Sequence, residues 1–272
     1  MRNCLLAGLT LVLLTVALVS SAAPYQAWLD HQAALAREPG LIRYYPLGVA
    51  PGGSLNLANL AGPGGTLGFA PSGELQLAPG RWPEQATPYL DEGWLQAQRF
   101  SLPERALTVE GWFRITGYGV HRGNSGSTTG TLISLGVGYW DGFRISYDYP
   151  NRTLGFEIGR PQPVGSVQVR SGVIGDYVWH HIVATWDGQQ MALYVDGLLV
   201  AEGAYDGPYY ETSAEATFRL GFADYGIGSV KLQVSEAALY SRALSKAEIQ
   251  AHAWFATPPT AQIGRASCRE RV

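Results

Sequence analysis

Hydrophobic and polar residues alternate along much of this chain, and the pattern is clearest between residues 179 and 200. The run Trp179-His180-His181-Ile182-Val183-Ala184-Thr185-Trp186 is followed by apolar runs at 193–195 and 198–200, with Asp-Gly at each reversal. Asp-Gly favours tight turns because glycine accepts a positive φ without a Cβ clash. The pattern predicts three consecutive antiparallel strands, with a type I′ turn at Asp196-Gly197.

A second strong strand is expected at residues 107–115. Leu107, Val109, Phe113 and Ile115 fall on one face of it, and Thr108, Glu110, Trp112 and Arg114 fall on the other. Further strands are expected at 41–47, 55–57, 65–69, 74–77, 89–90, 97–100, 131–135, 142–149, 153–158, 166–170 and 217–221; residues 229–234 open the next strand, and residues 237–245 close the domain. So many short strands joined by Gly- and Pro-rich turns predict an all-β fold, a two-sheet antiparallel sandwich of the jelly-roll type.

Two short helices are expected at the ends of this sandwich. Apolar residues at helical spacing predict the first within residues 24–40, and Pro39-Gly40 ends it. Ser245 and Glu248 have the spacing of a capping box, which predicts a second helix through Trp254.

Several of these runs resemble a known family. Residues 179–188 and 193–197 are similar to the signature of laminin-G-like (concanavalin A-like lectin/glucanase) jelly-roll domains, and so is the strand that contains Glu110, Gly111 and Trp112. The run Leu239-Tyr240-Ser241-Arg242-Ala243-Leu244-Ser245 resembles the motif that closes such domains. The resemblance extends from about Leu41 to Trp254 and is strongest in the second half. It implies a jelly-roll domain at 41–256 and either lectin-like binding or glycoside cleavage.

The two ends of the chain are expected to lie outside this domain. A basic start, an apolar run at 5–19 and small residues at 20–23 predict a secretory signal peptide over residues 1–22, and therefore a secreted, periplasmic or cell-surface protein. Residues 257–262 form a Pro-rich linker. Residues 263–272 look like translated sequencing-adapter sequence, so we expect a further domain C-terminal to the linker. No later segment is long enough for a membrane span.

Charge and cysteine content restrict the function. Without the two ends the chain keeps no cysteine, because Cys4 and Cys268 lie within them. Removing Arg2, Arg265, Arg269, Arg271 and Glu270 leaves 15 basic and 21 acidic residues. The excess of acidic residues argues against binding to nucleic acid or an anionic membrane through bulk charge. We expect a bacterial source, in which the Asn151-Arg152-Thr153 sequon has little meaning.

Catalytic motifs are lacking. Retaining glycosidases need two carboxyl groups about 5–5.5 Å apart, and the E-x-D-x-x-E pattern that the resemblance would bring is missing. A pair assembled from two strands, such as Glu110 with Glu157, stays open. There is no G-x-S-x-G or H-E-x-x-H motif, and the lack of cysteine excludes thiol chemistry. We therefore expect no catalytic residues in this module.

Calcium is the one cofactor that the resemblance suggests. Some laminin-G-like modules bind it at a rim of the sandwich, and the candidate ligands here are Asp141, Asp148 and Asp224, with Asp206 a further loop-borne aspartate. No dense D-x-D-x-D run marks them, so solvated turn aspartates are the favoured alternative. His180 and His181 point to opposite faces of a strand and cannot chelate one ion together.

Aromatic side chains in loops and at strand ends suggest sugar binding. Pyranose rings present C–H faces that stack on aromatic rings, while polar groups bind the hydroxyls. The candidate ligand-binding residues are Tyr118, His121, Tyr139, Trp140, Asp141, Tyr149, Tyr209, Tyr210 and Tyr225.

Of these, Tyr139-Trp140-Asp141 is the first choice, because Gly138 and Gly142 flank it. The alternative is that these aromatics only fill a large sandwich. We predict an exported, non-catalytic recognition module, part of a longer protein, that binds glycans, extracellular matrix or cell-surface partners. A glycoside-cleaving enzyme and a structural or adhesion spacer are the alternatives.

Overall fold

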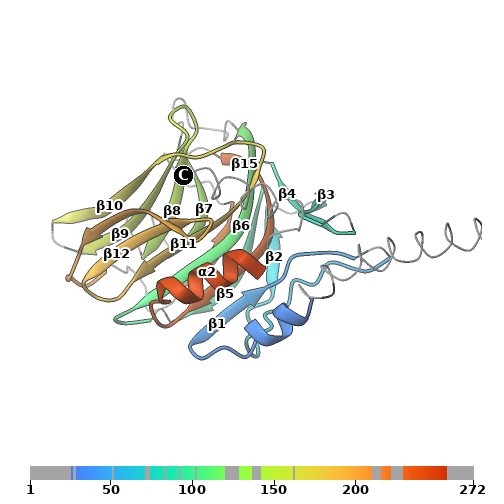
Figure 1. The fold of residues 1–272 in the computed structure, drawn as a ribbon, viewed down its shortest axis with the longest axis horizontal. Coiled ribbons are helices and arrows are strands. Elements are labelled where there is room, and N and C mark those ends of the chain that lie inside the picture. Colours follow the sequence, from blue (N-terminus) through green and yellow to red (C-terminus); the bar gives the residue numbers. More distant parts are fainter. Residues whose placement is uncertain are drawn as a thin grey trace, which may run out of the picture.

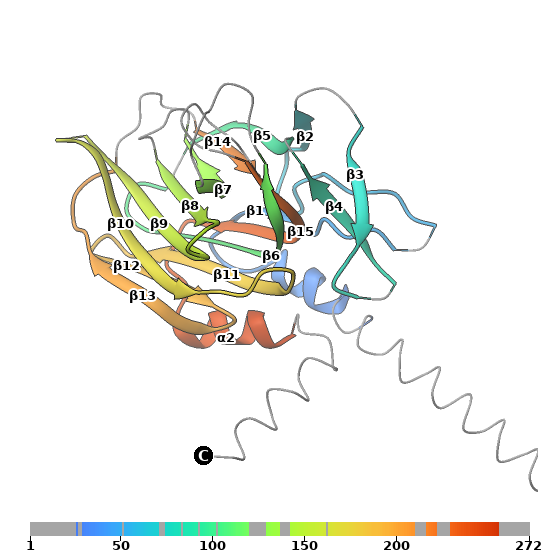
Figure 2. The same ribbon diagram turned by 90° about the horizontal axis from the view of Figure 1, so that it is seen from above.

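Two antiparallel sheets stack face to face, and two short helices lie on one side of them (Figures 1 and 2). The computed structural model describes residues 26, 29–50, 52–70, 74–82, 84–91, 93–101, 103–119, 129–136, 142–161, 163–209, 216–221 and 229–255. The segments interpreted as signal peptide, linker and adapter lie outside these residues.

The first sheet has eight strands and contains the run that was clearest in the sequence. Its order is β13-β12-β11-β6-β15-β4-β3, and β1 also pairs with β15. The strands are β1 (Leu41–Tyr45), β3 (Gln76–Pro79), β4 (Ala86–Leu90), β6 (Leu107–Gly119), β11 (Trp179–Trp186), β12 (Gln190–Val195), β13 (Leu198–Ala204) and β15 (Ser229–Tyr240).

The second sheet has seven strands in the order β10-β9-β8-β7-β14-β5-β2. They are β2 (Leu67–Ala70), β5 (Trp94–Phe100), β7 (Thr129–Leu135), β8 (Phe143–Asp148), β9 (Thr153–Pro161), β10 (Val164–Val173) and β14 (Ala216–Leu220). All pairings in both sheets are antiparallel. The predicted all-β jelly-roll sandwich is therefore confirmed.

The core fills the space between the sheets, and alternation along the strands decides which side chains enter it. Leu107, Val109, Phe113 and Ile115 of β6 all belong to the core cluster, as predicted. Glu110 lies on the opposite face of β6, toward the helices. That outer face has its own apolar contacts, because a second buried cluster joins Tyr44, Val183, Tyr240 and Ile249.

The two helices cover the outer face of the first sheet (Figure 2). Residues 29–35 are helical, and α2 spans Lys246–Phe255. The predicted capping box starts α2: Ser245 N–H donates to Glu248 Oε2 at 2.7 Å, and Glu248 N–H donates to Ser245 Oγ at 3.3 Å. Neither described helix is long and apolar enough to cross a membrane.

The local turn chemistry also agrees with the sequence. Asp196 and Gly197, which join β12 to β13, have φ values of 52° and 79°. Positive φ at both central residues is the mark of the type I′ turn. At the other reversal Asp187 Oδ1 accepts hydrogen bonds from the N–H groups of Gln189 and Gln190, which closes a longer turn.

One strand prediction was wrong. Residues 55–57 form no strand, because Leu57 makes a single backbone bond, from Leu67 N–H at 2.9 Å, instead of a ladder. The run at 229–234 opens β15, as predicted, and this strand continues to Tyr240 with a bulge between Val234 and Glu236. The extra residue of the bulge shifts the alternation of side chains along the strand.

Candidate functional site

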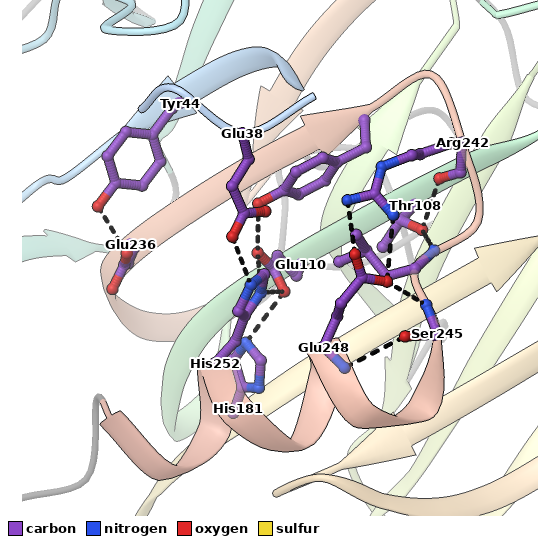
Figure 3. Close-up of polar contacts among 12 residues, drawn as sticks. Glu38, Tyr44, Thr108, Glu110, His181, Glu236, Arg242, Ser245, Glu248 and His252 are labelled. Atoms are coloured by element: carbon purple, nitrogen blue, oxygen red, sulfur yellow. Dashed lines mark hydrogen bonds and ion pairs between the residues drawn. The ribbon is translucent and has the colours of Figure 1, made fainter. Parts of the chain in front are cut away.

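A buried group of charged residues lies between the first sheet and the helices and has the residue types of a possible catalytic site (Figure 3). His252 of α2 lies between two carboxylates. Its Nδ1 is 3.1 Å from both oxygens of Glu110, and its Nε2 is 3.2 Å from Glu38 Oε1. His181 Nε2 approaches Glu110 at 3.4 Å, and the Tyr240 hydroxyl donates to Glu110 at 3.3 Å. We call these five residues the Glu110 network.

The network keeps His252 protonated and Glu110 ionised. Burial disfavours the protonated form of His252, but the carboxylates of Glu110 and Glu38 outweigh it and raise the pKa of His252 to about 11. Burial would likewise raise the pKa of Glu110, but His252 and His181 outweigh it and hold that pKa well below its usual range. His252 is therefore an imidazolium, and each of its ring nitrogens donates a hydrogen bond to a carboxylate. It ties α2 to both β6 and the segment after the N-terminal helix.

These pKa shifts predict how stability depends on pH. The raised pKa of His252 gives stabilisation that is complete below its unfolded value of 6.5 and is lost as pH rises through about 11. The lowered pKa of Glu110 gives stabilisation that is complete above 4.5 and is lost as pH falls. We therefore expect the stabilisation that the pair gives to the folded state to be greatest between pH 4.5 and pH 6.5. Urea unfolding at a series of pH values checks this, and stability that rises steadily above pH 7 would contradict it.

The network is closed to substrates. A cavity of about 10 Å³ lies beside it, lined by His31, Glu110, His181, Glu236 and neighbouring side chains. That volume is about what one water molecule needs. Glu110 and Glu236 are 4% and 7% exposed, and Glu236 is itself engaged by Arg81 at 3.2 Å and by the Tyr44 hydroxyl at 2.6 Å. These two carboxylates hold the fold together and face no open groove.

The pair of Glu110 with Glu157, the example of a two-strand acid pair given above, is also excluded. Glu110 lies on the outer face of the first sheet, whereas Glu157 lies on the outer face of the second. The core and about 10 Å of inter-sheet distance separate them. Glycosidase carboxyls lie about 5–9.5 Å apart on either side of one sugar bond, so Glu110 and Glu157 cannot serve as such a pair.

Three tyrosines gather at one end of the sandwich, and we call them the tyrosine platform. Tyr118 comes from the end of β6, Tyr149 follows β8, and Tyr177 lies in the connection from β10 to β11. The rings of Tyr118 and Tyr149 stack, with centroids 6.1 Å apart and an interplanar angle of 25°. Burial and then the Tyr177 phenol raise the pKa of Tyr149, which shows that these two hydroxyl groups are neighbours.

Tyr177 is held in a strained conformation. Its φ is 62°, in the left-handed region that aromatic residues rarely adopt. Two bonds to β6 hold it there: its N–H donates to Ile115 O at 2.8 Å, and its carbonyl accepts from Arg114 Nε at 3.0 Å. The side chain is 56% exposed, next to exposed Val178. Such strain is typical of sites where a side chain is presented to a ligand.

The other predicted ligand residues fall into two groups. Tyr209 does not join the platform, because its ring packs 5.0 Å from Phe143 and 6.3 Å from Trp186, at the opposite end of β8. The six residue steps from Phe143 to Tyr149 correspond to about 20 Å along a strand. The remaining predicted ligand residues lie outside the described residues: His121, Tyr139, Trp140, Asp141, Tyr210 and Tyr225.

The calcium prediction finds no donor set within the described residues. There, no group of three or more acidic, histidine or cysteine side chains could hold a metal ion. Asp148 accepts a hydrogen bond from Asn151 Nδ2 at 2.8 Å, and its other oxygen is buried without a partner. Asp141 and Asp224 lie outside the described residues, so calcium binding stays a prediction.

Comparison with known proteins agrees with this fold. A laminin G family model described as "Concanavalin A-like lectin/glucanases superfamily" matches residues 91–250, more than half of the chain. The chain belongs to this superfamily. No curated protein sequence matches it significantly.

Solved structures of binding domains share the superfamily fold with this chain. Domain 4 of AbnA, an extracellular arabinanase from Geobacillus stearothermophilus solved with arabinotriose, is 17% identical with a TM-score of 0.59, covering 78% of this chain and 98% of that one. The binding domain of Paraclostridial Mosquitocidal Protein 1 is 14% identical with a TM-score of 0.58, covering 79% of this chain and 52% of the other.

The binding domain of botulinum neurotoxin DC, solved with SialylT, is also 14% identical with a TM-score of 0.58, covering 79% and 50%. This chain thus matches about half the length of the toxin domains. At these identities the likeness shows the superfamily fold alone.

Proposed function

We propose that this chain is a non-catalytic glycan-binding module that holds sugar on its tyrosine platform. The observation that carries the proposal is the exposed Tyr177, presented by a strained backbone beside Tyr149. An aromatic ring offers an apolar face to the C–H groups of a sugar, while its hydroxyl bonds to the sugar's hydroxyl groups. The acid pairs tested above are closed or too far apart for glycoside cleavage, and two of the similar structures are domains solved with a saccharide bound.

The setting of the module is part of the same proposal. We infer export from the N-terminal apolar segment and a further domain after the Pro-rich linker, so that the module would direct a longer protein to a glycan, matrix or cell surface. Calcium would bind through Asp148 if it is needed, and glycan binding in the presence of a chelator tests this. An adhesion spacer without a glycan ligand is the main alternative, and the next experiment separates the two.

Tyr177→Ala is expected to lower affinity for the bound glycan by about tenfold, because it removes the most exposed ring of the platform. Tyr177→Phe should stay within about threefold, since it keeps the stacking face. A glycan array identifies the ligand and calorimetry measures the affinities. Trp254→Ala is the control, because Trp254 is equally exposed but lies on α2.

Two outcomes would count against the platform. Equal affinity of Tyr177→Ala and the unmodified chain would remove Tyr177 from the site. Loss of binding in Trp140→Ala alone would favour Tyr139-Trp140-Asp141, the first choice from the sequence, over the platform. No binding to any glycan would favour the spacer.

A further inference from the structure

The outer face of the second sheet carries a row of aligned residues, six of which have polar side chains. One residue from each of the seven strands takes part, and each is the direct register partner of the next. In strand order from β2 to β10 they are Gly68, Gln96, Arg219, Ser134, Arg144, Glu157 and Gln168. We call them the polar row. Neighbouring residues on these strands, such as Phe218, Ile145 and Phe156, enter the core, so the row faces outward.

The two outer faces of the sandwich differ in composition. Helices and apolar side chains cover the first sheet, whereas no described helix covers the second (Figure 2). Six strand spacings of about 4.8 Å make the row about 29 Å long. It is therefore an extended line of hydrogen-bonding groups across one face, partly buried where the side chains of Arg144 and Glu157 are 13% and 10% exposed.

The carboxylate in the row is neutralised by the chain itself. Glu157 Oε1 accepts from Ser146 Oγ at 2.8 Å and from Gln168 Nε2 at 2.9 Å, and its other oxygen pairs with Arg144. Gly155 makes these bonds possible, since a Cβ there would lie 2.5 Å from Gln168 Nε2. The side chains at this end of the row are therefore fixed before any ligand arrives.

The net charge of this face is positive. Among the described residues, Arg144, Arg219 and the exposed Arg170, which donates to Gln168 at 2.8 Å, stand against two carboxylates on this face, those of Glu157 and of Asp148 further along β8. The whole chain has a net charge of −3. All three cations are arginines, whose planar fork matches a carboxylate better than the ammonium group of lysine does.

One further feature indicates a saccharide. Trp94, two residues before Gln96 on the same face of β5, donates from Nε1 to Gln96 Oε1 at 3.2 Å and places an aromatic ring at one end of the row.

We propose that the polar row binds an acidic oligosaccharide, a glycan whose sugars carry carboxylates. Arg219 and Arg144 bind the carboxylates, the glutamines bind hydroxyl groups, and Trp94 stacks on a sugar ring. This inference rests on the proposed function and gives it a substrate class. The row is a second contact surface, distinct from the tyrosine platform.

Calorimetry of the whole chain tests the inference. The ligands are oligogalacturonate, a sialylated oligosaccharide and neutral oligosaccharides of the same length. We expect at least about tenfold tighter binding of one of the acidic glycans, weakened by added salt. Arg219→Gln should abolish that preference and leave neutral binding unchanged. Arg37→Gln is the matched control, because it removes the same charge from an exposed site after the N-terminal helix.

Arg219 also donates to the carbonyl of Gly136 at 2.9 Å, so a second variant protects the test against misfolding. Arg170 is exposed. Arg170→Gln should lower the affinity for the acidic glycan by about threefold and leave the melting temperature unchanged.

Equal binding of acidic and neutral glycans, unaffected by both variants, would overturn this inference and leave the proposed function standing. Binding of polyglutamate with the same dependence on Arg219 would overturn the saccharide assignment. Failure of every glycan to bind would overturn both proposals.

Discussion

Glu110→Gln is expected to lower the free energy of unfolding by about 3–5 kcal/mol, the cost of removing one partner from a buried ion pair. The amide keeps the shape of the carboxylate but cannot compensate the imidazolium of His252, which is buried against it. His252 must then give up its proton or stay charged in a poorly solvated site. Urea unfolding at pH 6 measures the loss.

The matched control for this change is Glu202→Gln, an exposed carboxylate on β13. It should change stability by less than about 0.5 kcal/mol, as most surface substitutions do. The double variant Glu110→Gln/His252→Gln should be clearly more stable than the sum of the single effects predicts, since residues in one network couple by about 0.5–3 kcal/mol. Additive effects would show that the ion pair contributes nothing of its own.

Trp186→Ala is expected to cost about 3–5 kcal/mol, the range for removing a large aromatic from a core. Trp186 is 2% exposed and its ring lies 5.9 Å from that of Phe143. Its Nε1 also donates to Tyr205 O at 2.8 Å, so the change leaves a cavity and an unsatisfied carbonyl. We expect the segment that carries Tyr205 and Tyr209 to loosen, with faster amide exchange there.

Trp254→Ala is the control, because that tryptophan is 55% exposed. Its melting temperature should stay within a few degrees of that of the unmodified chain. If Trp254→Ala lost as much stability as Trp186→Ala, burial in the core would not explain the contribution of Trp186 to the free energy of unfolding.

The residues that carry the family resemblance maintain the fold. Gly111 stands in the motif position for a small residue because a Cβ there would lie 2.7 Å from Glu236 O. Thr108 Oγ1 donates to Arg242 O at 2.9 Å and accepts from Leu244 N–H at 2.8 Å, while Arg242 pairs with Glu248 at the start of α2. The motif therefore identifies the superfamily, and it says little about the ligand.

The candidate site was only partly predictable. Tyr118 and Tyr149 were among the predicted ligand residues, and the structure places them in contact. Tyr177 was missed, because its exposure and positive φ depend on two bonds from β6, a strand some sixty residues earlier in the chain. Trp94 and the polar row were missed for a similar reason: single Arg, Ser, Gln and Glu residues on six strands form a row only when the register aligns them.

By itself the sequence determined most of the secondary structure and which face of the strand at 107–115 enters the core, because period-two alternation, Asp-Gly turns and a capping box are local properties. The order of the strands and the register came only from tertiary structure. They placed Glu110 against His252 and separated Glu110 from Glu157 by a core. Side chains far apart in the chain become one site only when backbone pairing fixes their distance, and no local pattern contains that information.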